Sequence, residues 1–278
     1  MSETFAEGLN LLRIYITIYG VLIVRYVLFA GIAILLIWKV LGQRLQHRLI
    51  QKKKPERDKM IQEIKYSLST FVIFALTGVG VYLARTSGIS LMYAEIQDYG
   101  WGYFLFSVVA MIFAHDTYFY WTHRAMHHKL LFKRVHLVHH RSTNPSPWAS
   151  FAFHPTEAVV EAAIVPIMIF VIPLHPFVIL AFIMYMNFFN VLGHLAFELY
   201  PKGFTKSKLW GWNNTTTHHN MHHKYFNCNY GLYFNIWDKL MGTNHAKYHD
   251  TFEEVTSRQP ETRSELATSQ TPTLATKV

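Results

Sequence analysis

The chain has 278 residues, of which 51% are apolar, 16% aromatic and 15% charged, and its formal net charge is +9. A soluble domain usually carries about 25% charged residues, so this composition predicts a protein that lies partly in lipid. The single cysteine, Cys228, excludes an internal disulfide framework and a cysteine-based metal cluster. The basic residues lie beside apolar segments, which argues against nucleic-acid binding and favours contact with anionic headgroups.

The first predicted membrane span covers residues 11–40 and is long enough to cross a bilayer. It is too long for a cleavable signal peptide, and no basic region precedes it. Arg13 lies near its start and can reach the interface. Arg25 is interior, so it has to find a partner or tilt towards an interface.

Three further apolar segments follow, at residues 68–83, 101–120 and 158–192. The last is long enough for two spans, which Pro173 and Pro176 separate. We therefore predict an all-α integral membrane protein with about four transmembrane helices and a histidine-rich helical cap on the cytoplasmic side.

Lysine and arginine predict the orientation of these spans. The connection between the first two spans carries Lys39, Arg44, Arg48, Lys52, Lys53, Lys54, Arg57, Lys59 and Lys65. The connections at residues 86–100 and 173–176 carry none. The positive-inside rule then places the basic connection, residues 121–157 and everything after His194 in the cytoplasm. The membrane would be a bacterial inner membrane or the endoplasmic reticulum.

Composition also predicts the division of the chain. Residues 1–100 form the N-terminal spans and the basic connection, residues 101–249 carry the chemistry, and residues 250–278 form a disordered tail rich in Ser, Thr, Glu and Gln. The sequence has no Gly-rich phosphate loop and no nucleotide fingerprint, so we expect neither a flavin nor a nicotinamide domain in it.

Sixteen of the 17 histidines lie between residues 115 and 249. His123 and His127 have i,i+4 spacing, and residues 136–140 and 219–223 each form an H-x-x-H-H group. On a helix such a group would bring three imidazoles to one locus. The resulting eight nitrogens suit two metal ions better than one. A zinc protease is excluded because the H-E-x-x-H glutamate is missing from residues 124–126, whereas a metal-binding tract without catalysis and a pH sensor remain alternatives.

Other polar residues are candidates for supporting roles. His194 can complete a coordination sphere, with Glu198 four residues later as a ligand or hydrogen-bond acceptor. Asp116 and Asp238 can each orient a histidine through its ring N–H, and Asp238 can instead pair with an arginine such as Arg124. Two residues of the F-H-P-T-E segment, His154 and Glu157, are further candidates, although His154 can equally be a helix-start residue. The sequence assigns no role to His115, His128, His218, His245 and His249.

Five segments resemble the fatty acid hydroxylase/sterol desaturase superfamily, most closely its sterol C5-desaturase and C4-methyl oxidase branch. They are D-T-Y-F-Y-W-T-H-R-A-M-H-H (116–128), H-L-V-H-H (136–140), A-F-H-P-T-E (152–157), H-H-N-M-H-H (218–223) and N-Y-G-L-Y-F-N-I-W-D-K-L-M-G-T (229–243). The resemblance implies a membrane non-haem di-iron oxidase that uses O₂ and externally supplied electrons. The implied ligands are His123, His127, His136, His139, His140, His194, His219, His222 and His223. His115 and Glu198 depart from the residues that some relatives carry.

The expected reaction is hydroxylation or desaturation at an unactivated C–H position of a sterol-like or fatty-acyl membrane lipid. A non-catalytic divalent-metal transporter or sensor is the alternative. Electrons would come from a separate donor, such as a cytochrome b5-like protein or a ferredoxin with its reductase. The donor would dock on a basic rim, and anionic headgroups are an equally good partner for that rim. The rim comprises Lys129, Lys133, Arg134 and Arg141. The sequence leaves the oligomeric state open.

Overall fold

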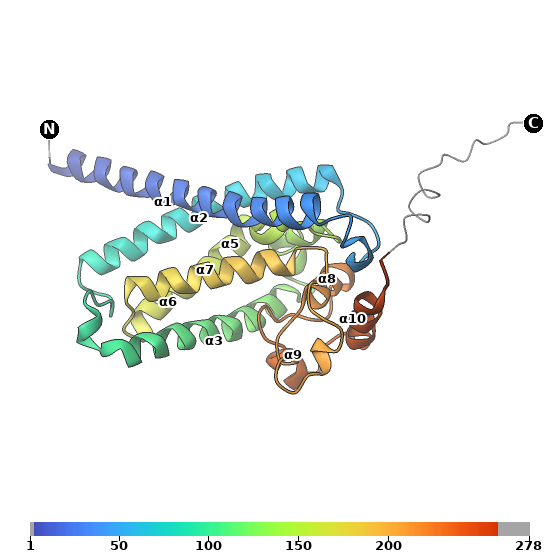
Figure 1. Ribbon diagram of the computed structural model, residues 1–278. Coiled ribbons are helices and arrows are strands. Elements are labelled where there is room, and N and C mark those ends of the chain that lie inside the picture. The colour runs from blue at the N-terminus through green and yellow to red at the C-terminus, as the bar shows by residue number, and fades with distance from the viewer. Residues whose placement is uncertain (1–2, 261–278) are drawn as a thin grey trace, which may run out of the picture.

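A computed structural model describes residues 3–260, which fold into helices joined by short connections (Figure 1). The helices are α1 (Glu3–Ala33), α2 (Arg57–Thr86), α3 (Gly100–Met126), α4 (Phe132–Val135), α5 (Pro155–Ala162), α6 (Ile164–Val171), α7 (Pro176–Gly193), α8 (Thr216–Tyr225), α9 (Ile236–Leu240) and α10 (Tyr248–Ser257). A π-helical stretch, Ile34–Val40, prolongs α1, and 3-10 turns lie at Gln46–Arg48, Ile96–Asp98, His139–Arg141, Pro147–Phe151 and Phe204–Lys206. Two isolated β-bridges are the only extended pairings within residues 3–260. The all-α prediction is confirmed.

Four helical segments are long and apolar enough to cross a membrane: Thr4–Val40, Arg57–Thr86, Gly100–Met126 and Pro176–Gly193. Their outward sides carry large exposed apolar residues such as Ile16, Val24 and Leu105, which are suited to contact with lipid chains. The prediction of about four membrane helices is confirmed, and the protein is an integral membrane protein. The second span is longer than predicted, because the basic residues from Arg57 onwards already belong to α2.

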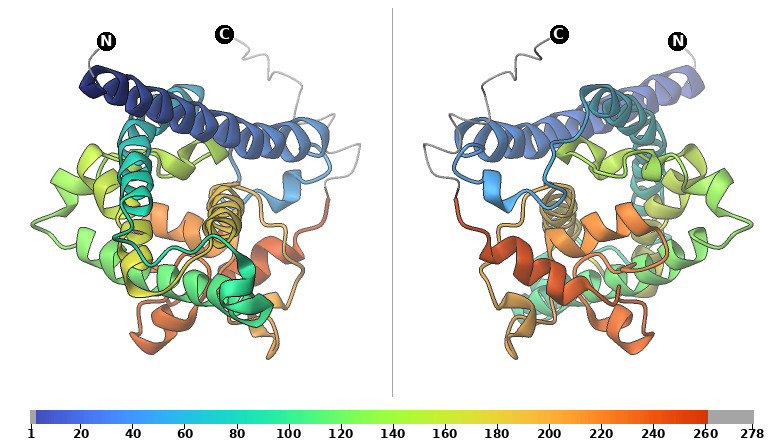
Figure 2. Two further views of the ribbon diagram at one scale, coloured as in Figure 1. Left: turned by 90° about the vertical axis from the view of Figure 1, so that its left-hand side faces the viewer. Right: turned by 90° about the vertical axis from the view of Figure 1, so that its right-hand side faces the viewer.

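Helix α7 lies in the middle of the bundle, surrounded by the other long helices, when the molecule is viewed along their axes (Figure 2). One core joins α7 to α1, α2 and the Pro147–Phe151 turn through residues such as Tyr26, Phe71 and Val191. A second core joins α7 to α2, α3 and α6. The two N-terminal helices therefore share their core with the histidine-bearing part of the chain. The proposed boundary near residue 100 stays a prediction.

The segment 158–192 does not form two long spans. Its first part is divided into α5 and α6, and only α7 is long enough to cross a membrane alone. The break between α6 and α7 lies where the two prolines predict it. This turn contacts the 86–100 connection, where the Tyr93 amide donates to the Leu174 carbonyl at 3.3 Å. These two connections therefore lie together at one end of the bundle, opposite α8 and α10 (Figure 1).

Residues 250–257 are helical, so the predicted disordered tail begins too early. Helix α10 places Tyr248, Phe252 and Val255 on one side, where they are buried, and Tyr248 and Phe252 pack with Met221 of α8. The i, i+4, i+7 spacing of these three apolar residues is a helical signal that the polar average composition of the segment hides. Residues 261–278, the rest of the predicted tail, lie outside the described residues.

Candidate metal centre

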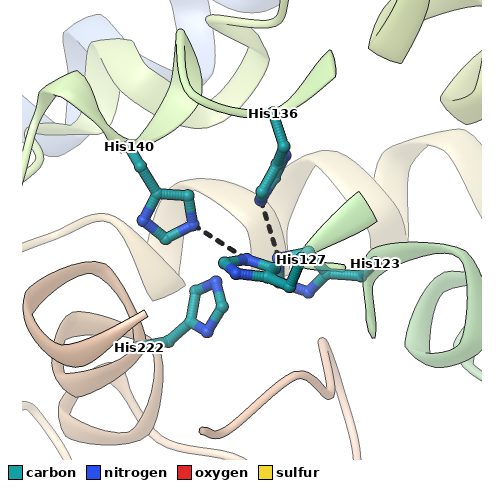
Figure 3. Close-up of side chains that lie close together, drawn as sticks. All are labelled: His123, His127, His136, His140 and His222. Carbon is teal, nitrogen blue, oxygen red and sulfur yellow. Dashed lines mark hydrogen bonds between the residues drawn. The ribbon is translucent and has the colours of Figure 1, made fainter. Parts of the chain in front are cut away.

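All nine predicted histidine ligands meet at the end of the bundle that carries α8. They form two groups in which the candidate ligand atoms lie within 4.8 Å of one another. The five-histidine cluster consists of His123, His127, His136, His140 and His222 (Figure 3). The four-histidine cluster consists of His139, His194, His219 and His223. Their role as metal ligands stays a prediction, but the structure brings each of them to a partner set that can hold an ion.

The two H-x-x-H-H groups are divided between the clusters, contrary to the prediction that each would serve one locus. In α8, His219 and His223 point into the four-histidine cluster and His222 into the other. The division of the first group is reversed, because the i and i+4 residues of 136–140 join the five-histidine cluster and His139 joins the four-histidine cluster. This first group is not a helix, since α4 ends at Val135 and a 3-10 turn begins at His139.

The physical reason for this division is the direction of the side chains. On a helix, residues four apart differ by about 40° in direction, whereas adjacent residues differ by about 100°. His219 and His223 therefore share a face of α8, and His222 faces away from His223. In this way, one helix supplies histidines to both clusters.

Within the five-histidine cluster, ring nitrogens approach one another closely. The Nε2 atoms of His123 and His136 are 3.0 Å apart, and those of His127 and His140 are 3.1 Å apart (Figure 3). His123 lies in the last turn of α3, His136 directly follows α4, and His222 belongs to α8. Three segments of the chain thus converge on one point.

Ring nitrogens also approach one another closely in the four-histidine cluster. The Nε2 atom of His194 lies 3.0 Å from that of His219 and 3.4 Å from that of His139, and the His219 and His223 Nε2 atoms are 3.2 Å apart. His194 immediately follows α7, so the central membrane helix ends directly at this cluster.

In four of the clustered rings, a backbone carbonyl determines which ring nitrogen carries the hydrogen and which one has a free lone pair. The Nδ1–H groups of His123, His222, His223 and His194 donate to the carbonyls of Tyr230, Cys228, Ser142 and Asn190, at 2.8, 2.7, 3.0 and 2.7 Å. A carbonyl only accepts, so Nδ1 must carry the hydrogen and Nε2 must present its lone pair. Each cluster receives two such lone pairs. The Nε2 atom of His222 is buried and has no hydrogen-bond partner among residues 3–260.

Burial also keeps the rings neutral. Desolvation, reinforced by neighbouring histidines, lowers the pKa well below the ordinary value for His136, His139, His140, His219, His222 and His223. Burial lowers the pKa of His194 to about 4. Neutral imidazole is the form that binds metals, and the unpartnered lone pair of His222 is one that a cation satisfies. The residues present therefore fit a metal ion in each cluster.

The two clusters are neighbours. The ring centroids of His140 and His223, which belong to different clusters, are 4.8 Å apart. Those of His136 and His139 are 5.3 Å apart. Ions held in the two clusters would therefore be adjacent, and a single small substrate group can lie near both.

Glu157 contacts one of the clustered histidines, as its predicted supporting role requires. Its Oε1 atom is 2.7 Å from Nδ1 of His136, and both side chains are almost completely buried. A carboxylate in this position accepts from Nδ1–H and directs Nε2 towards the metal. Burial raises the pKa of Glu157 well above its ordinary value, with a further contribution from Glu161. Burial by itself therefore favours the protonated carboxyl group, and a metal ion held through His136 would favour the carboxylate.

Three acidic candidates contact other groups instead of the clusters. Asp116 accepts from the amides of Tyr233 and Phe234, and no histidine contacts it, contrary to the prediction. Glu198 accepts from the amide and hydroxyl of Thr217, at 2.8 and 2.7 Å, so it binds the first turn of α8 and not a metal. It thereby helps to hold the helix that carries His219, His222 and His223.

Asp238 accepts from the amides of Tyr230 and Gly231 and from Thr243, and its Oδ2 atom lies 3.3 Å from Nε2 of His218. Burial by itself would raise the pKa of Asp238, but the proximity of His218 and the hydrogen bonds from Thr243 and Gly231 lower it to about 2. The carboxylate thus lies within ion-pair distance of a histidine outside both clusters, and its orienting role stays a prediction. It also holds the loop whose Tyr230 carbonyl accepts from His123.

His154 is a helix-start residue and belongs to neither cluster. Its Nδ1 atom contacts the Thr156 hydroxyl at 2.7 Å and accepts from the Thr156 amide, at the beginning of α5. Of the histidines without an assigned role, His115 is buried against Phe182 and Tyr233, and His245 stacks on Tyr225. Neither is part of a metal-binding group.

The carbonyls of Ser142, Cys228 and Tyr230 were missed by sequence reasoning. They are main-chain groups in loops up to 107 residues away from the rings they orient. Any residue type has a carbonyl, so no side-chain pattern identifies them. The irregular backbone at Phe226 and Asn229, both with positive φ, shapes the loop that presents two of them.

Comparison with known proteins gives a consistent result. Residues 108–243 match the family described as fatty acid hydroxylase. Lathosterol oxidase from Mus musculus is 32% identical over 209 residues, which are 74% of this chain and 68% of that protein. The Homo sapiens lathosterol oxidase is 30% identical over 199 residues, 71% of this chain and 65% of that protein.

A Delta(7)-sterol 5(6)-desaturase from Gibberella zeae is 30% identical over 207 residues, which cover 74% of this chain and 61% of that protein. No solved structure matches the chain. The matched family region contains all nine clustered histidines.

Proposed function

Because this chain belongs to the fatty acid hydroxylase family, in its sterol desaturase branch, we propose that it oxidises a sterol-like membrane lipid with O₂ at a pair of iron ions. The chain is a membrane lipid oxidoreductase. The identity and number of the metals, the use of O₂ and the exact lipid are the parts that we propose. A fatty-acyl lipid is the second substrate class that the family admits.

The observation that carries the proposal is the pair of adjacent all-histidine clusters. Imidazole donors suit iron, copper, zinc and nickel, and among these a redox-active ion is needed to oxidise a C–H bond. Two clusters with four and five histidines suit one ion each. When bound, an iron pair supplies the means to activate O₂ and remove hydrogen from an unactivated carbon.

The protein's own residues keep this centre in place and dry. Asn190, Ser142, Cys228 and Tyr230 hold four rings through their carbonyls, and Glu157 holds a fifth. Eight of the nine clustered rings are buried, His127 being the exception. Exclusion of water protects a strong oxidant from side reactions. Helices α3 and α7 end at the clusters, and we propose that an apolar substrate reaches them from the bilayer along these helices.

The test is a lipid analysis of cells that express the protein, together with the metal content of the purified chain. We expect iron in both clusters and one changed lipid. A gain of one oxygen would identify a hydroxylase, and a loss of two hydrogens a desaturase. An unchanged lipid profile under aerobic conditions, with a functional electron donor present, would contradict the proposal.

A divalent-metal transporter or sensor is not supported. A transporter needs polar residues along a path through the spans. Here the nine histidines gather at one end of the bundle, and the relatives reported above are named as oxidases and desaturases. The oxidase is therefore the function that both kinds of observation favour.

We further propose that the end carrying the clusters faces the cytoplasm, in a bacterial inner membrane or the endoplasmic reticulum. Leu49 and Gln51 of the basic connection contact this end, with the Gln51 side chain donating to the Thr143 carbonyl at 2.8 Å. The basic connection and the clusters must therefore lie on one side, and lysine and arginine favour the cytoplasm.

Cysteine labelling in intact cells tests this orientation. Lys53→Cys and Lys133→Cys change exposed residues at the cluster end, and Ser87→Cys changes an exposed residue at the opposite end. We expect an impermeant reagent to label only Ser87→Cys from outside, because the lipid barrier protects the other two. The native Cys228 is buried, which keeps the background low. External labelling of Lys53→Cys or Lys133→Cys would overturn the orientation.

Electrons are proposed to come from a separate carrier, a cytochrome b5-like protein or a ferredoxin with its reductase. The four residues of the basic rim, Lys129, Lys133, Arg134 and Arg141, are all exposed and lie in the segment that carries His127, His136 and His140. Small electron carriers are commonly acidic, so complementary charge speeds their encounter with such a rim. Anionic headgroups remain the competing partner.

Reversing Lys133 and Arg134 to glutamate is expected to slow reduction by the carrier about 10-fold or more at low salt, as in other steered encounters. Reduction by dithionite should stay unchanged. The matched control reverses Lys206 and Lys208, which are exposed but outside the rim. Stopped-flow reduction at several salt concentrations measures both. Equal slowing with carrier and dithionite would show damage to the metal centre and contradict docking at the rim.

A further inference from the structure

A cavity of about 190 Å³ lies inside the membrane part of the bundle, among α1, α2, α5, α6 and α7. Its walls are apolar side chains such as Ile18, Phe74 and Met186, with two charged exceptions, Arg25 and Glu161. The hydroxyl of Thr77, also at the wall, donates to the Ile73 carbonyl of its own helix. The cavity therefore has two charged groups on an otherwise apolar surface.

Neither charged group has a partner within the described part of the chain. The Nε atom of Arg25 is buried without a hydrogen-bond acceptor, and none of the ion pairs within residues 3–260 involves Arg25 or Glu161. An unpaired guanidinium in a membrane-spanning helix is costly, and such residues usually mark a functional contact. The two groups border the same space without binding each other, which indicates that something else binds between them.

The charged part of the cavity is next to the metal centre. Glu161 lies one turn after Glu157 on α5, and Glu157 contacts His136 of the five-histidine cluster at 2.7 Å. The apolar part extends the other way, to Gly78 and Val81 in the second half of α2, towards the end of the bundle without histidines. A molecule in the cavity would thus have its polar end near the clusters.

The two groups select one chemical class. A guanidinium only donates hydrogen bonds and a carboxylate only accepts them, whereas a hydroxyl does both. A cationic amine would be repelled by Arg25, whereas a hydroxyl fits both groups without adding a charge to the cavity. We propose that Arg25 and Glu161 bind the hydroxyl group of a lipid alcohol, with its apolar body along α1, α2 and α7. This proposal rests on the proposed function, because the lipid alcohol is taken to be the substrate.

The size of the cavity agrees with this assignment. Complete small-molecule pockets measure roughly 300–1,000 Å³, and the 190 Å³ here holds only part of a lipid. The hydroxyl end and the adjoining ring or chain would occupy it, and the remainder would extend between the helices. The distance from the hydroxyl to the oxidised carbon is then determined by the protein, which makes the pair a determinant of regioselectivity.

Equilibrium binding to the purified, metal-loaded protein tests the proposal without electrons or turnover. The probes are two matched pairs, lathosterol with its 3-deoxy analogue and hexadecan-1-ol with hexadecane. We expect wild type to bind at least one alcohol about 10- to 100-fold more tightly than its partner, as for a hydroxyl bound to charged groups. The ratio should fall to about 1–3 in Arg25→Met and in Glu161→Met, and stay closer to wild type in Glu161→Gln, which keeps an acceptor.

Arg13→Met is the matched control, since Arg13 is an exposed arginine of the same helix and should leave the ratio unchanged. Metal content and thermal melting show whether each variant is folded. If only one of the two methionine variants is folded, that variant is sufficient to test the proposal. Equal binding of both members of each pair in wild type, or a preference that survives both methionine variants, would overturn the proposal. Failure of the proposed function looks different, because wild type would then lack iron or leave every lipid unoxidised.

Discussion

Replacing His222 with alanine is expected to abolish lipid oxidation and to remove the metal of the five-histidine cluster. His139→Ala should likewise abolish oxidation, but it should empty the four-histidine cluster. Loss of one ligand weakens its site strongly, because the remaining nitrogens cannot complete the coordination. Each variant should therefore retain about one of two metal ions, as measured by elemental analysis.

The division of neighbouring histidines makes this prediction specific. His222 and His223 are adjacent in the chain but belong to different clusters, whereas His222 and His140 are 82 positions apart in the sequence and belong to the same one. Iron spectroscopy of His222→Ala should therefore resemble that of His140→Ala and differ from that of His223→Ala. If each H-x-x-H-H group served one metal, the spectrum of His222→Ala would instead resemble that of His223→Ala and differ from that of His140→Ala.

The matched control is His128→Ala. His128 is exposed, adjoins His127 and belongs to neither cluster, so its loss should leave both iron content and oxidation near wild type. Full activity with full iron content in His139→Ala or His222→Ala would refute the metal centre. Equal loss of both ions in every variant would instead show that the two sites bind their ions cooperatively.

Glu157→Gln is expected to weaken metal binding in the five-histidine cluster by about 10- to 100-fold, with a matching loss of activity at limiting iron. Glutamine can still accept from Nδ1–H of His136, but it lacks the negative charge that makes the imidazole a stronger donor. Competition with a chelator measures the affinity, and excess iron should restore much of the activity. A variant that cannot be restored by iron would indicate misfolding.

Glu161→Gln provides the control for this variant. It makes the same chemical change one turn later on α5, at a carboxylate that contacts no histidine of either cluster. Its effect on metal affinity should be much smaller than that of Glu157→Gln, because Glu161 acts on the clusters only through the charge of Glu157. Equal weakening in both variants would mean that charge in α5, and not the contact with His136, determines metal affinity.

The sequence by itself determined the fold class, the membrane helices and the identity of the clustered histidines. These features depend on local pattern: long apolar segments require a lipid environment, and histidines are too polar to be buried in number without a common partner. All nine histidines singled out from spacing and resemblance lie in the two clusters. The apolar spacing of α10 was also present in the sequence, but the polar average composition of the segment hid it.

Only the tertiary structure decided how these histidines are shared. The direction of a side chain depends on the local backbone, and residues 136–140 turn out not to be a helix, so spacing could not assign His139. The contacts of the acids were decided in the same way, since Glu157 contacts the clustered His136 whereas Glu198 binds the start of α8. Arg25 and Glu161 are 136 positions apart in the sequence, and only the packing of α1 and α5 against α2 places both at one cavity. Contacts of this kind depend on the meeting of distant segments, which no local pattern encodes.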